Sequence, residues 1–273
     1  MNNIRLAFIG AGNMARAIIG GLIAKGYPAE LISASATRQE TLDEVSRQFG
    51  ITVSTDNGAL ARTADVVVLA VKPQMLKAVT LELKPALAHK PLIISVAAGI
   101  TTQSMAEWLG ADQAIVRSMP NTPSQVQTGA AGLFANANTS VEQRQSASQI
   151  LGAVGVVQWL EDEALLNPVT AVSGSGPAYF FLMMEAMIDA GVELGLSRAC
   201  ATELTLQTAL GAALLASNSD VDVAELRRRV TSPKGTTEQA INSFEADGIR
   251  AMVSRAMKAC ADRSLELSEQ LGQ

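Results

Sequence analysis

Six residues near the N-terminus have the types and spacing of a dinucleotide-binding turn. Gly10-Ala11-Gly12-Asn13-Met14-Ala15 follows the pattern G-x-G-x-x-A. The first glycine permits a tight turn, the second lets a pyrophosphate approach the backbone, and the small last residue lets helix and strand pack closely. The free N–H groups at the following helix start would favour the anion. The alternative is an incidental glycine turn in a flavodoxin-like domain, but here the motif follows a predicted strand and opens a predicted helix.

A second short segment indicates which dinucleotide would bind. NAD-binding sites place an acidic residue about 20 positions after the fingerprint. Here that position falls on Ser35, in Ser33-Ala34-Ser35-Ala36-Thr37-Arg38, a segment with no carboxylate. The hydroxyls of Ser35 and Thr37 and the guanidinium of Arg38 suit a 2′-phosphate, so we expect NADPH, with NADH as the alternative. If Arg38 is only a surface residue at a helix start, the preference stays open.

Three further segments fall where predicted strands end, which is the edge at which open α/β sheets bind ligands. They are Ala70-Val71-Lys72-Pro73, Ala97-Ala98-Gly99 and Met119-Pro120-Asn121-Thr122-Pro123. Lys72 could contact phosphate or act in catalysis, or it could simply start a helix before Pro73. The paired prolines would make the third segment rigid enough to line a nicotinamide pocket, although a plain connecting turn has the same residue types.

A fourth loop carries hydroxyl groups and a glycine just before a predicted helix over residues 238–246. It reads Thr231-Ser232-Pro233-Lys234-Gly235-Thr236-Thr237. Backbone N–H groups at the helix start, together with the hydroxyls of Ser232, Thr236 and Thr237, would form a pocket for a carboxylate. On residue types alone, an elaborate N-terminal cap is the preferred interpretation.

These loops need a sheet to position them, and the apolar pattern of the first half predicts one. Short apolar runs at residues 5–9, 31–34, 51–53, 66–71, 92–96 and 114–118 alternate with helical patterns. Such alternation predicts an α/β fold with a doubly wound, Rossmann-like parallel sheet. Strand signals stop near residue 160, and the remaining chain reads as successive helices. We therefore expect a Rossmann-like domain over residues 1–160 and an all-helical domain over residues 161–273.

The composition excludes several classes of protein. The chain has 273 residues, of which 48% are hydrophobic and 17% charged, with a net charge of -5, as is typical of a globular protein with a buried core. The short basic run at residues 227–229 suits the last turn of a helix, so nucleic acid is not an expected partner. Acidic residues interrupt the apolar stretch 178–196, which argues against a membrane span. Cys200 and Cys260 have no metal or redox spacing and suit reduced thiols in a cytoplasmic protein, and His89 lies in a predicted surface stretch.

The chain resembles the pyrroline-5-carboxylate reductase family. Five stretches carry the resemblance, in the family's order from one end of the chain to the other: Phe8-Ile9-Gly10-Ala11-Gly12-Asn13-Met14, Ala70-Val71-Lys72-Pro73, Met119-Pro120-Asn121-Thr122-Pro123, Val172-Ser173-Gly174-Ser175-Gly176-Pro177-Ala178-Tyr179 and Thr231-Ser232-Pro233-Lys234-Gly235-Thr236-Thr237. The first stretch alone would fit many dehydrogenases, but the five together are highly specific.

The resemblance implies that NAD(P)H reduces the C=N bond of 1-pyrroline-5-carboxylate to give L-proline, the last step of proline synthesis. It also implies a homodimer interlocked through the helical domain, assembled further into a decamer in some members, with the active site between one subunit's Rossmann domain and the partner's helices. The substrate would be held by the loop residues Ser232, Gly235, Thr236 and Thr237. The cofactor would be bound by Asn57 at the adenosine ribose and by a groove lined with Ala70, Val71, Lys72, Pro73, Ala97 and Asn121. Lys234 stands where the family usually has glycine.

Hydride transfer to an imine needs the nicotinamide held against C5 and the ring nitrogen protonated, so positioning and electrostatics would be the protein's contribution. We expect Thr237 to hydrogen-bond the ring nitrogen, with water or bulk acid supplying the proton. Two alternatives remain. A β-hydroxyacid dehydrogenase would need a catalytic lysine in the helical half, where only Lys234 and Lys258 occur. An NADP-sensing regulatory protein would bind cofactor without turnover.

Overall fold

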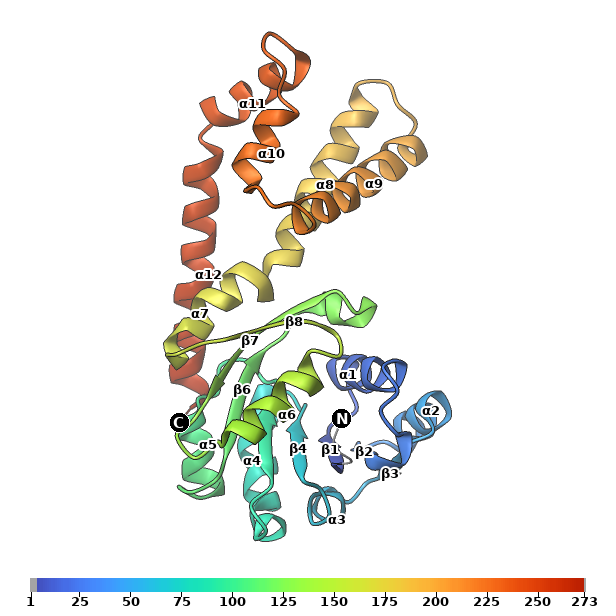
Figure 1. Ribbon diagram of the computed structural model, residues 1–273, viewed down its shortest axis with the longest axis vertical. Helices are drawn as coiled ribbons and strands as arrows, with labels where there is room; N and C mark the ends of the chain where they lie inside the picture. The colour runs from blue at the N-terminus through green and yellow to red at the C-terminus, as the bar shows by residue number, and fades with distance from the viewer. Residues whose placement is uncertain (1–3, 273) are drawn as a thin grey trace. The chain divides into compact units, whose positions relative to one another are not determined.

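The apolar runs of the first half form strands of one eight-stranded sheet in the computed structural model, which describes residues 4–272 (Figure 1). The strands are β1 (Leu6–Ile9), β2 (Ile32–Ser35), β3 (Thr52–Ser54), β4 (Val66–Leu69), β5 (Leu92–Ser95), β6 (Ile115–Met119), β7 (Gly129–Ala135) and β8 (Gly155–Trp159). Their order is β3-β2-β1-β4-β5-β6-β7-β8, and only the β6–β7 pair is antiparallel. The predicted doubly wound, Rossmann-like sheet is confirmed, with its switch point between β1 and β4.

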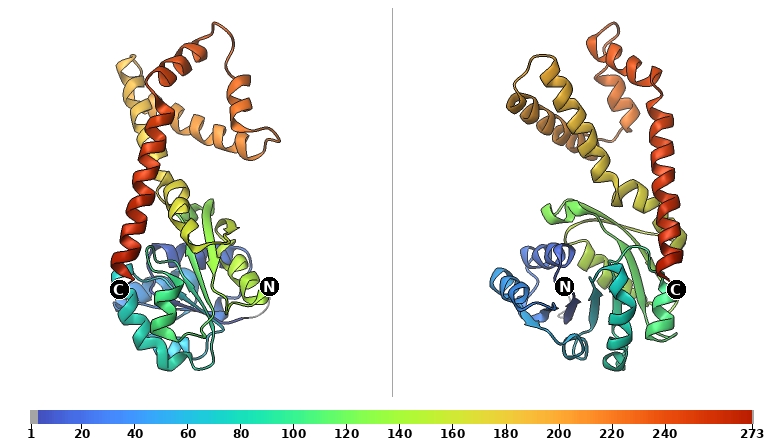
Figure 2. Two further views of the ribbon diagram at one scale, coloured as in Figure 1. Left: turned by 90° about the vertical axis from the view of Figure 1, so that its left-hand side faces the viewer. Right: turned by 180° about the vertical axis from the view of Figure 1, so that it is seen from behind.

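Helices cover both faces of this sheet (Figures 1 and 2). One face carries α1 (Asn13–Ala24), α2 (Gln39–Phe49) and α6 (Val141–Leu151), and the other carries α3 (Asn57–Ala61), α4 (Pro73–Leu83) and α5 (Thr102–Leu109). Successive strand residues point to opposite faces, so Leu6 and Phe8 belong to one core while Ala7 and Ile9 belong to the other. Burial on both faces is why these strands read as continuous apolar runs.

The structure adds two strands to the six that the apolar runs predict. Both begin with a glycine, and β7 has a second one at Gly132. A Cβ on Gly155 of β8 would lie 1.9 Å from the carbonyl oxygen of Gly129 in β7, and a Cβ on Gly132 would lie 2.9 Å from the Val169 side chain. In β7, the small residues that allow this approach also leave no β-branched residue from which a strand would be predicted.

The chain forms two compact units. Unit 2 is Gly176–Lys258, and unit 1 is the chain before it together with the residues from Ala259 onward. The expected boundary after residue 160 marks the end of the sheet. Beyond it, α7 (Leu166–Val169) and the π-helical turn Thr170–Gly174 still belong to unit 1, because both pack against β7.

The last helix, α12 (Ile249–Leu271), ends in unit 1. Its Ser264 hydroxyl donates to the Asn167 side chain at 2.8 Å, and Leu271 packs against the core on the α4–α5 face. The stretch at residues 172–179, one of the five that carry the resemblance, is helical, because the π-helical turn runs to Gly174 and α8 starts at Gly176.

A largely buried carboxylate joins three elements of unit 1. Glu163 accepts hydrogen bonds from the Thr102 N–H at 2.8 Å, the Thr102 hydroxyl at 2.6 Å and the Arg117 guanidinium at 3.0 Å. The Arg117 side chain is 7% exposed and that of Glu163 is 18% exposed. Thr102 starts α5 after the loop at residues 97–99, and Arg117 lies in β6 before the loop at residues 119–123. The pair therefore fixes the elements beside two of the predicted cofactor loops.

Unit 2 is entirely helical, as predicted. It contains α8 (Gly176–Glu193), α9 (Arg198–Ser217), α10 (Val223–Arg229), α11 (Thr236–Ala246) and the first part of α12. The helices α8 and α9 pack together, yet many of their large apolar side chains are exposed, Phe180, Phe181, Leu182, Leu204 and Leu210 among them. By length and composition α9 could cross a membrane. Within the described chain, 11% of its most apolar 18-residue stretch is buried.

Candidate active site

The glycine turn after β1 has the close approach that its sequence predicts. Gly10 has a φ of +99°, and a Cβ there would lie 2.7 Å from the carbonyl oxygen of Ala70 at the end of β4. Its N–H donates to the Ser35 carbonyl at 3.1 Å, which ties the turn to β2. Both the backbone conformation and the space therefore require glycine at this position.

The second glycine leaves the start of α1 open. Gly12 is the N-cap of α1, and a Cβ built on it meets nothing within 4 Å. The first turn of α1 carries no acidic residue, and glycine has no side chain to cap the helix. The space beside Gly12 is thus open, and a pyrophosphate placed there would be stabilised by the N–H groups of the first turn and by the helix dipole. These features fit the pyrophosphate of a dinucleotide.

Gly12→Ala should weaken NADPH binding roughly 10- to 100-fold, because the added methyl group would occupy the position where the pyrophosphate approaches. The free energy of unfolding should change by less than about 1 kcal/mol, since the methyl group enters open space. Fluorescence titration with NADPH and urea unfolding would measure the two effects. As a matched control, Gly10→Ala should destabilise the fold itself. Unchanged NADPH affinity in Gly12→Ala would place the pyrophosphate elsewhere.

A groove of about 860 Å³ extends from this turn across the ends of the strands. Ten of the residues predicted to bind cofactor line it: Gly10, Ala11, Gly12, Asn13, Ser35, Thr37, Arg38, Asn57, Val71 and Lys72. Lys72 is also the N-cap of α4, with Pro73 as the first helical residue. The sequence left open whether Lys72 starts a helix or contacts the cofactor, and in the structure it both starts the helix and lines the groove. Its exposed side chain can reach a phosphate.

At the end of the groove next to β2, the two predicted hydroxyls differ in their surroundings. Ser35 is 1% exposed, and its hydroxyl donates to the Asn57 side-chain oxygen at 2.6 Å. Thr37 and Arg38 are exposed in the groove. The Ser35 hydroxyl therefore orients Asn57, while Thr37 and Arg38 have the accessible groups for a 2′-phosphate.

Five predicted cofactor residues are not in the lining of this groove. Met14 is partly buried against the core, Ala97 is 4% exposed, and Ala70 lies beneath Gly10. Pro73 starts α4 behind Lys72. Met14, Ala70 and Ala97 pack against or within the core of unit 1, so they support the groove from below and do not line it.

Asn121, the fifth of them, connects two segments instead of pointing into the groove. Its side chain is buried, donates to the Ser173 carbonyl at 3.0 Å and accepts from the Ala130 N–H at 2.9 Å. Both the NH2 group and the oxygen of the Asn121 amide therefore already have hydrogen-bond partners. Its observed role is to fasten the loop after β6 to β7 and to the π-helical turn.

The groove also contains charged residues that sequence reasoning missed. Arg16, Glu40 and Glu44 line it. The sequence segment at residues 33–38 has no carboxylate, but the fold brings in two from α2. Arg16 lies one position past the six-residue fingerprint. A cation so close to an expected pyrophosphate could have been predicted from the sequence to line the groove.

The predicted substrate loop lies in unit 2 and ends at the N-terminus of α11. Gly235 is the N-cap, and Thr236 and Thr237 are the first helical residues. The first hydrogen bond of the helix runs from the Gln239 N–H to the Gly235 carbonyl, so the N–H groups of Thr236 and Thr237 have no partner within the helix. Within the described residues, no hydrogen bond occupies the Thr237 hydroxyl, which is exposed. The loop has the donors that a carboxylate needs, so its geometry is compatible with the predicted substrate site.

Lys234 has an unusual backbone conformation in this loop. Its φ is +59°, and its N–H donates to the Glu238 carboxylate at 2.8 Å. The Gly235 N–H closes the same turn on the Ser232 carbonyl at 3.0 Å. A left-handed conformation costs a residue with a Cβ about 1–2 kcal/mol, which explains why glycine is usual here in the family that the chain resembles. The Glu238 bond compensates for part of that cost.

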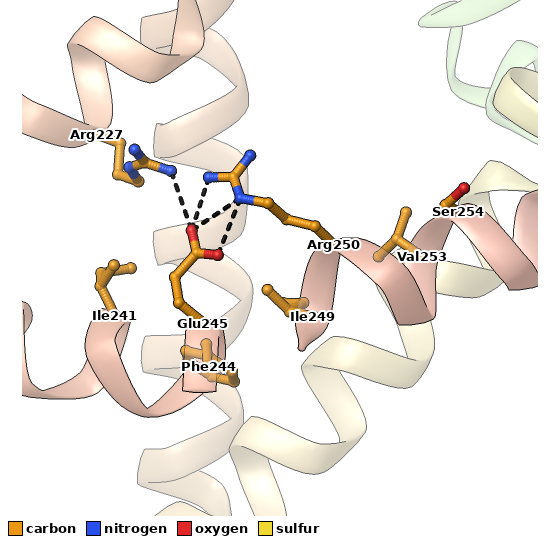
Figure 3. A pocket seen from close by; sticks show the side chains of 8 residues that line it. All are labelled: Arg227, Ile241, Phe244, Glu245, Ile249, Arg250, Val253 and Ser254. Atoms are coloured by element: carbon orange, nitrogen blue, oxygen red, sulfur yellow. Dashed lines mark hydrogen bonds and ion pairs between the residues drawn. The ribbon is translucent and has the colours of Figure 1, made fainter. Parts of the chain in front are cut away.

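A second hollow, of about 480 Å³, lies within unit 2 (Figure 3). Its lining is mostly apolar, with Glu245 placed between Arg250, at 2.7 Å, and Arg227, at 3.7 Å. Hydrogen bonds from Arg250 lower the pKa of the Glu245 carboxyl below its usual value. No residue predicted for substrate or cofactor lines this hollow, so it is not part of the candidate site.

Comparisons with known proteins match both halves of the chain. The family model described as "Pyrroline-5-carboxylate reductase dimerisation" matches residues 163–267, and that described as "NADP oxidoreductase coenzyme F420-dependent" matches residues 5–99. The chain is 56% identical over 273 residues to the pyrroline-5-carboxylate reductase of Pseudomonas aeruginosa, with 100% of both chains covered.

Solved structures give the same result. A pyrroline-5-carboxylate reductase from Coxiella burnetii is 47% identical with a TM-score of 0.95, covering 98% of this chain and 99% of that one. The Plasmodium falciparum pyrroline carboxylate reductase with NADP bound is 31% identical with a TM-score of 0.85, again covering 98% and 99%.

Proposed function

The chain belongs to the pyrroline-5-carboxylate reductase family, and we propose that it reduces the C=N bond of 1-pyrroline-5-carboxylate with NADPH to give L-proline. The reaction forms a C–H bond at C5, adds a proton to the ring nitrogen and oxidises NADPH to NADP⁺. One observation carries this proposal beyond the family relationship. The start of α1 is uncapped and free of acidic residues, and it opens into a groove in a chain that matches reductases over its full length.

The groove supports NADPH as the cofactor. Thr37 and Arg38 are accessible beside Asn57 at the end of β2, where a dinucleotide's ribose lies in this fold. A relative of the same family was solved with NADP bound. NADH remains a weaker alternative, because it lacks the 2′-phosphate that these groups would bind.

When bound, NADPH supplies the hydride. The chain's own contribution would come from the loop before α11. We assign the substrate carboxylate to the Ser232 hydroxyl and the N–H groups of Thr236 and Thr237, since these donors precede the first intrahelical bond. The Thr237 hydroxyl would hydrogen-bond the ring nitrogen and orient it for a proton from water. Glu238 directs its carboxylate to the Lys234 N–H and so does not occupy those donors.

A second copy of the chain would cover the exposed apolar side chains of α8 and α9. Contiguous apolar surface on a monomer usually marks an interface, and the family model for dimerisation spans these helices. We therefore propose a homodimer formed through unit 2 that acts in the cytoplasm without a membrane or nucleic-acid partner. Light scattering would show whether these dimers assemble further into a decamer.

The proposed reaction is tested by following NADPH oxidation with and without pyrroline-5-carboxylate, and then repeating it with NADH. We expect substrate-dependent oxidation with a lower KM for NADPH. A lower KM for NADH would retain the reaction but contradict the 2′-phosphate assignment. Binding of cofactor without oxidation would favour a sensor, and oxidation of a hydroxyacid would favour the dehydrogenase class.

A further inference from the structure

An ion pair spans the first two helices at the adenosine end of the groove. The Arg16 guanidinium, on α1, donates from Nη2 to the Glu44 carboxylate at 2.8 Å and from Nε to the Ala11 carbonyl at 3.2 Å. Both side chains line the groove together with Thr37 and Arg38. The second contact ties Arg16 to the fingerprint turn itself, so its position depends on the turn that would hold the dinucleotide.

The charges around this pair are nearly balanced. Two carboxylates line the groove, Glu40 and Glu44, against the three cations Arg16, Arg38 and Lys72. The hydrogen bond from Arg16, and then its charge, lower the pKa of the Glu44 carboxyl, with smaller contributions from Arg47 and Arg38. Glu44 is therefore ionised at neutral pH. An ionised carboxylate in this place would repel a phosphate unless a cation neutralised it.

Arg16 has donors to spare. A guanidinium has five N–H groups, and the two contacts to Glu44 and Ala11 use two of them. Its fork geometry suits a phosphate better than a point charge would. Arg16 can therefore neutralise Glu44 and contact a phosphate at the same time.

We propose that Arg16 is a specificity-determining residue that makes the groove accept a 2′-phosphorylated adenosine by neutralising Glu44 and donating to the phosphate. This inference rests on the proposed function, because it assigns a residue to the cofactor of that reaction. It adds Arg16 and Glu44 to Thr37 and Arg38 as residues that determine how the groove binds the 2′-phosphate.

The test uses two fragments of the cofactor with the full-length protein. Calorimetric titration with 2′,5′-ADP and with 5′-AMP separates the 2′-phosphate from the rest of the adenosine. Arg16→Ala should weaken 2′,5′-ADP binding roughly 10- to 100-fold, as expected for loss of a charged hydrogen bond, and leave 5′-AMP binding within about twofold. Arg47→Ala is the matched control, because it removes a cation near Glu44 from the same helix but does not line the groove. It should change neither titration by more than about twofold.

Glu44→Gln provides an independent test, made both with Arg16 present and in the Arg16→Ala background. Removing the carboxylate charge should tighten 2′,5′-ADP binding several-fold in the natural chain and recover much of the loss in the Arg16→Ala background. Equal weakening of both fragments by Arg16→Ala would assign Arg16 to the 5′-phosphate or to the scaffold and overturn the proposal. So would an unchanged affinity of Glu44→Gln for 2′,5′-ADP.

The two proposals can fail separately. If the natural chain makes proline but Arg16→Ala does not distinguish the fragments, only the Arg16 assignment is wrong. If Arg16→Ala distinguishes them and the natural chain makes no proline, the assignment holds and the proposed reaction is wrong.

Discussion

Thr237→Ala is expected to lower kcat by roughly 100-fold or more while the Kd for NADPH stays within about twofold. A donor aimed at the atom whose charge changes in the transition state contributes roughly 10²–10³-fold to turnover, and the Thr237 hydroxyl is assigned to the ring nitrogen. Because Thr237 is exposed in the first turn of α11, the fold should tolerate the change. Steady-state kinetics with pyrroline-5-carboxylate and titration with NADPH measure the two quantities.

The control for this variant is Thr237→Ser, which keeps the hydroxyl and removes only a methyl group. It should retain most of the turnover. A rise in KM at constant kcat in Thr237→Ala would mean that the hydroxyl contributes only to substrate binding. Unchanged kinetics would remove Thr237 from the mechanism.

Glu163→Ala is expected to lower the free energy of unfolding by about 3–5 kcal/mol, because it leaves the buried Arg117 guanidinium without its partner. The same change deprives the Thr102 N–H and hydroxyl of their acceptor. Urea unfolding compares the variant with the natural chain. Glu161→Ala, an exposed glutamate two residues away, is the matched control and should change stability by less than about 0.5 kcal/mol.

Adding Arg117→Met to Glu163→Ala tests whether the unpaired charge causes the loss. The double variant removes that charge and should recover part of the stability. Equal unfolding free energies for Glu163→Ala and Glu161→Ala would show that the buried pair contributes little.

The sequence predicts β1, β4, β5 and β6 well, because those strands are buried on both faces and read as apolar runs. It also predicts the partly exposed β2 and β3, from shorter runs. It does not predict β7 and β8. In those strands a Cβ on Gly129, Gly132 or Gly155 would lie less than 3 Å from Ser124, Val169 or Gly129, respectively, and contacts that form only on folding leave no local pattern. Close approach is a property of the folded chain, so only the three-dimensional structure reveals it.

The candidate site shows the same limit. The glycine turn and the ends of β2 and β4 could be predicted because they lie at fixed offsets from strands. The hydrogen-bond partners of the side chains could not be predicted. Ser35 is bound to Asn57 and Asn121 to Ser173 and Ala130, and Glu44 enters the groove from another helix. Residue type indicates which hydrogen bonds a side chain can make, whereas its neighbours in the fold decide which ones it makes.

The most direct test of the proposed reaction follows the transferred hydrogen. With NADPH deuterated at both C4 positions of the nicotinamide and with unlabelled pyrroline-5-carboxylate, mass spectrometry should find one deuterium in each proline, at C5. One proline should form for each NADPH oxidised. Proline without deuterium, or NADPH oxidation without proline, would contradict hydride transfer to the C=N bond.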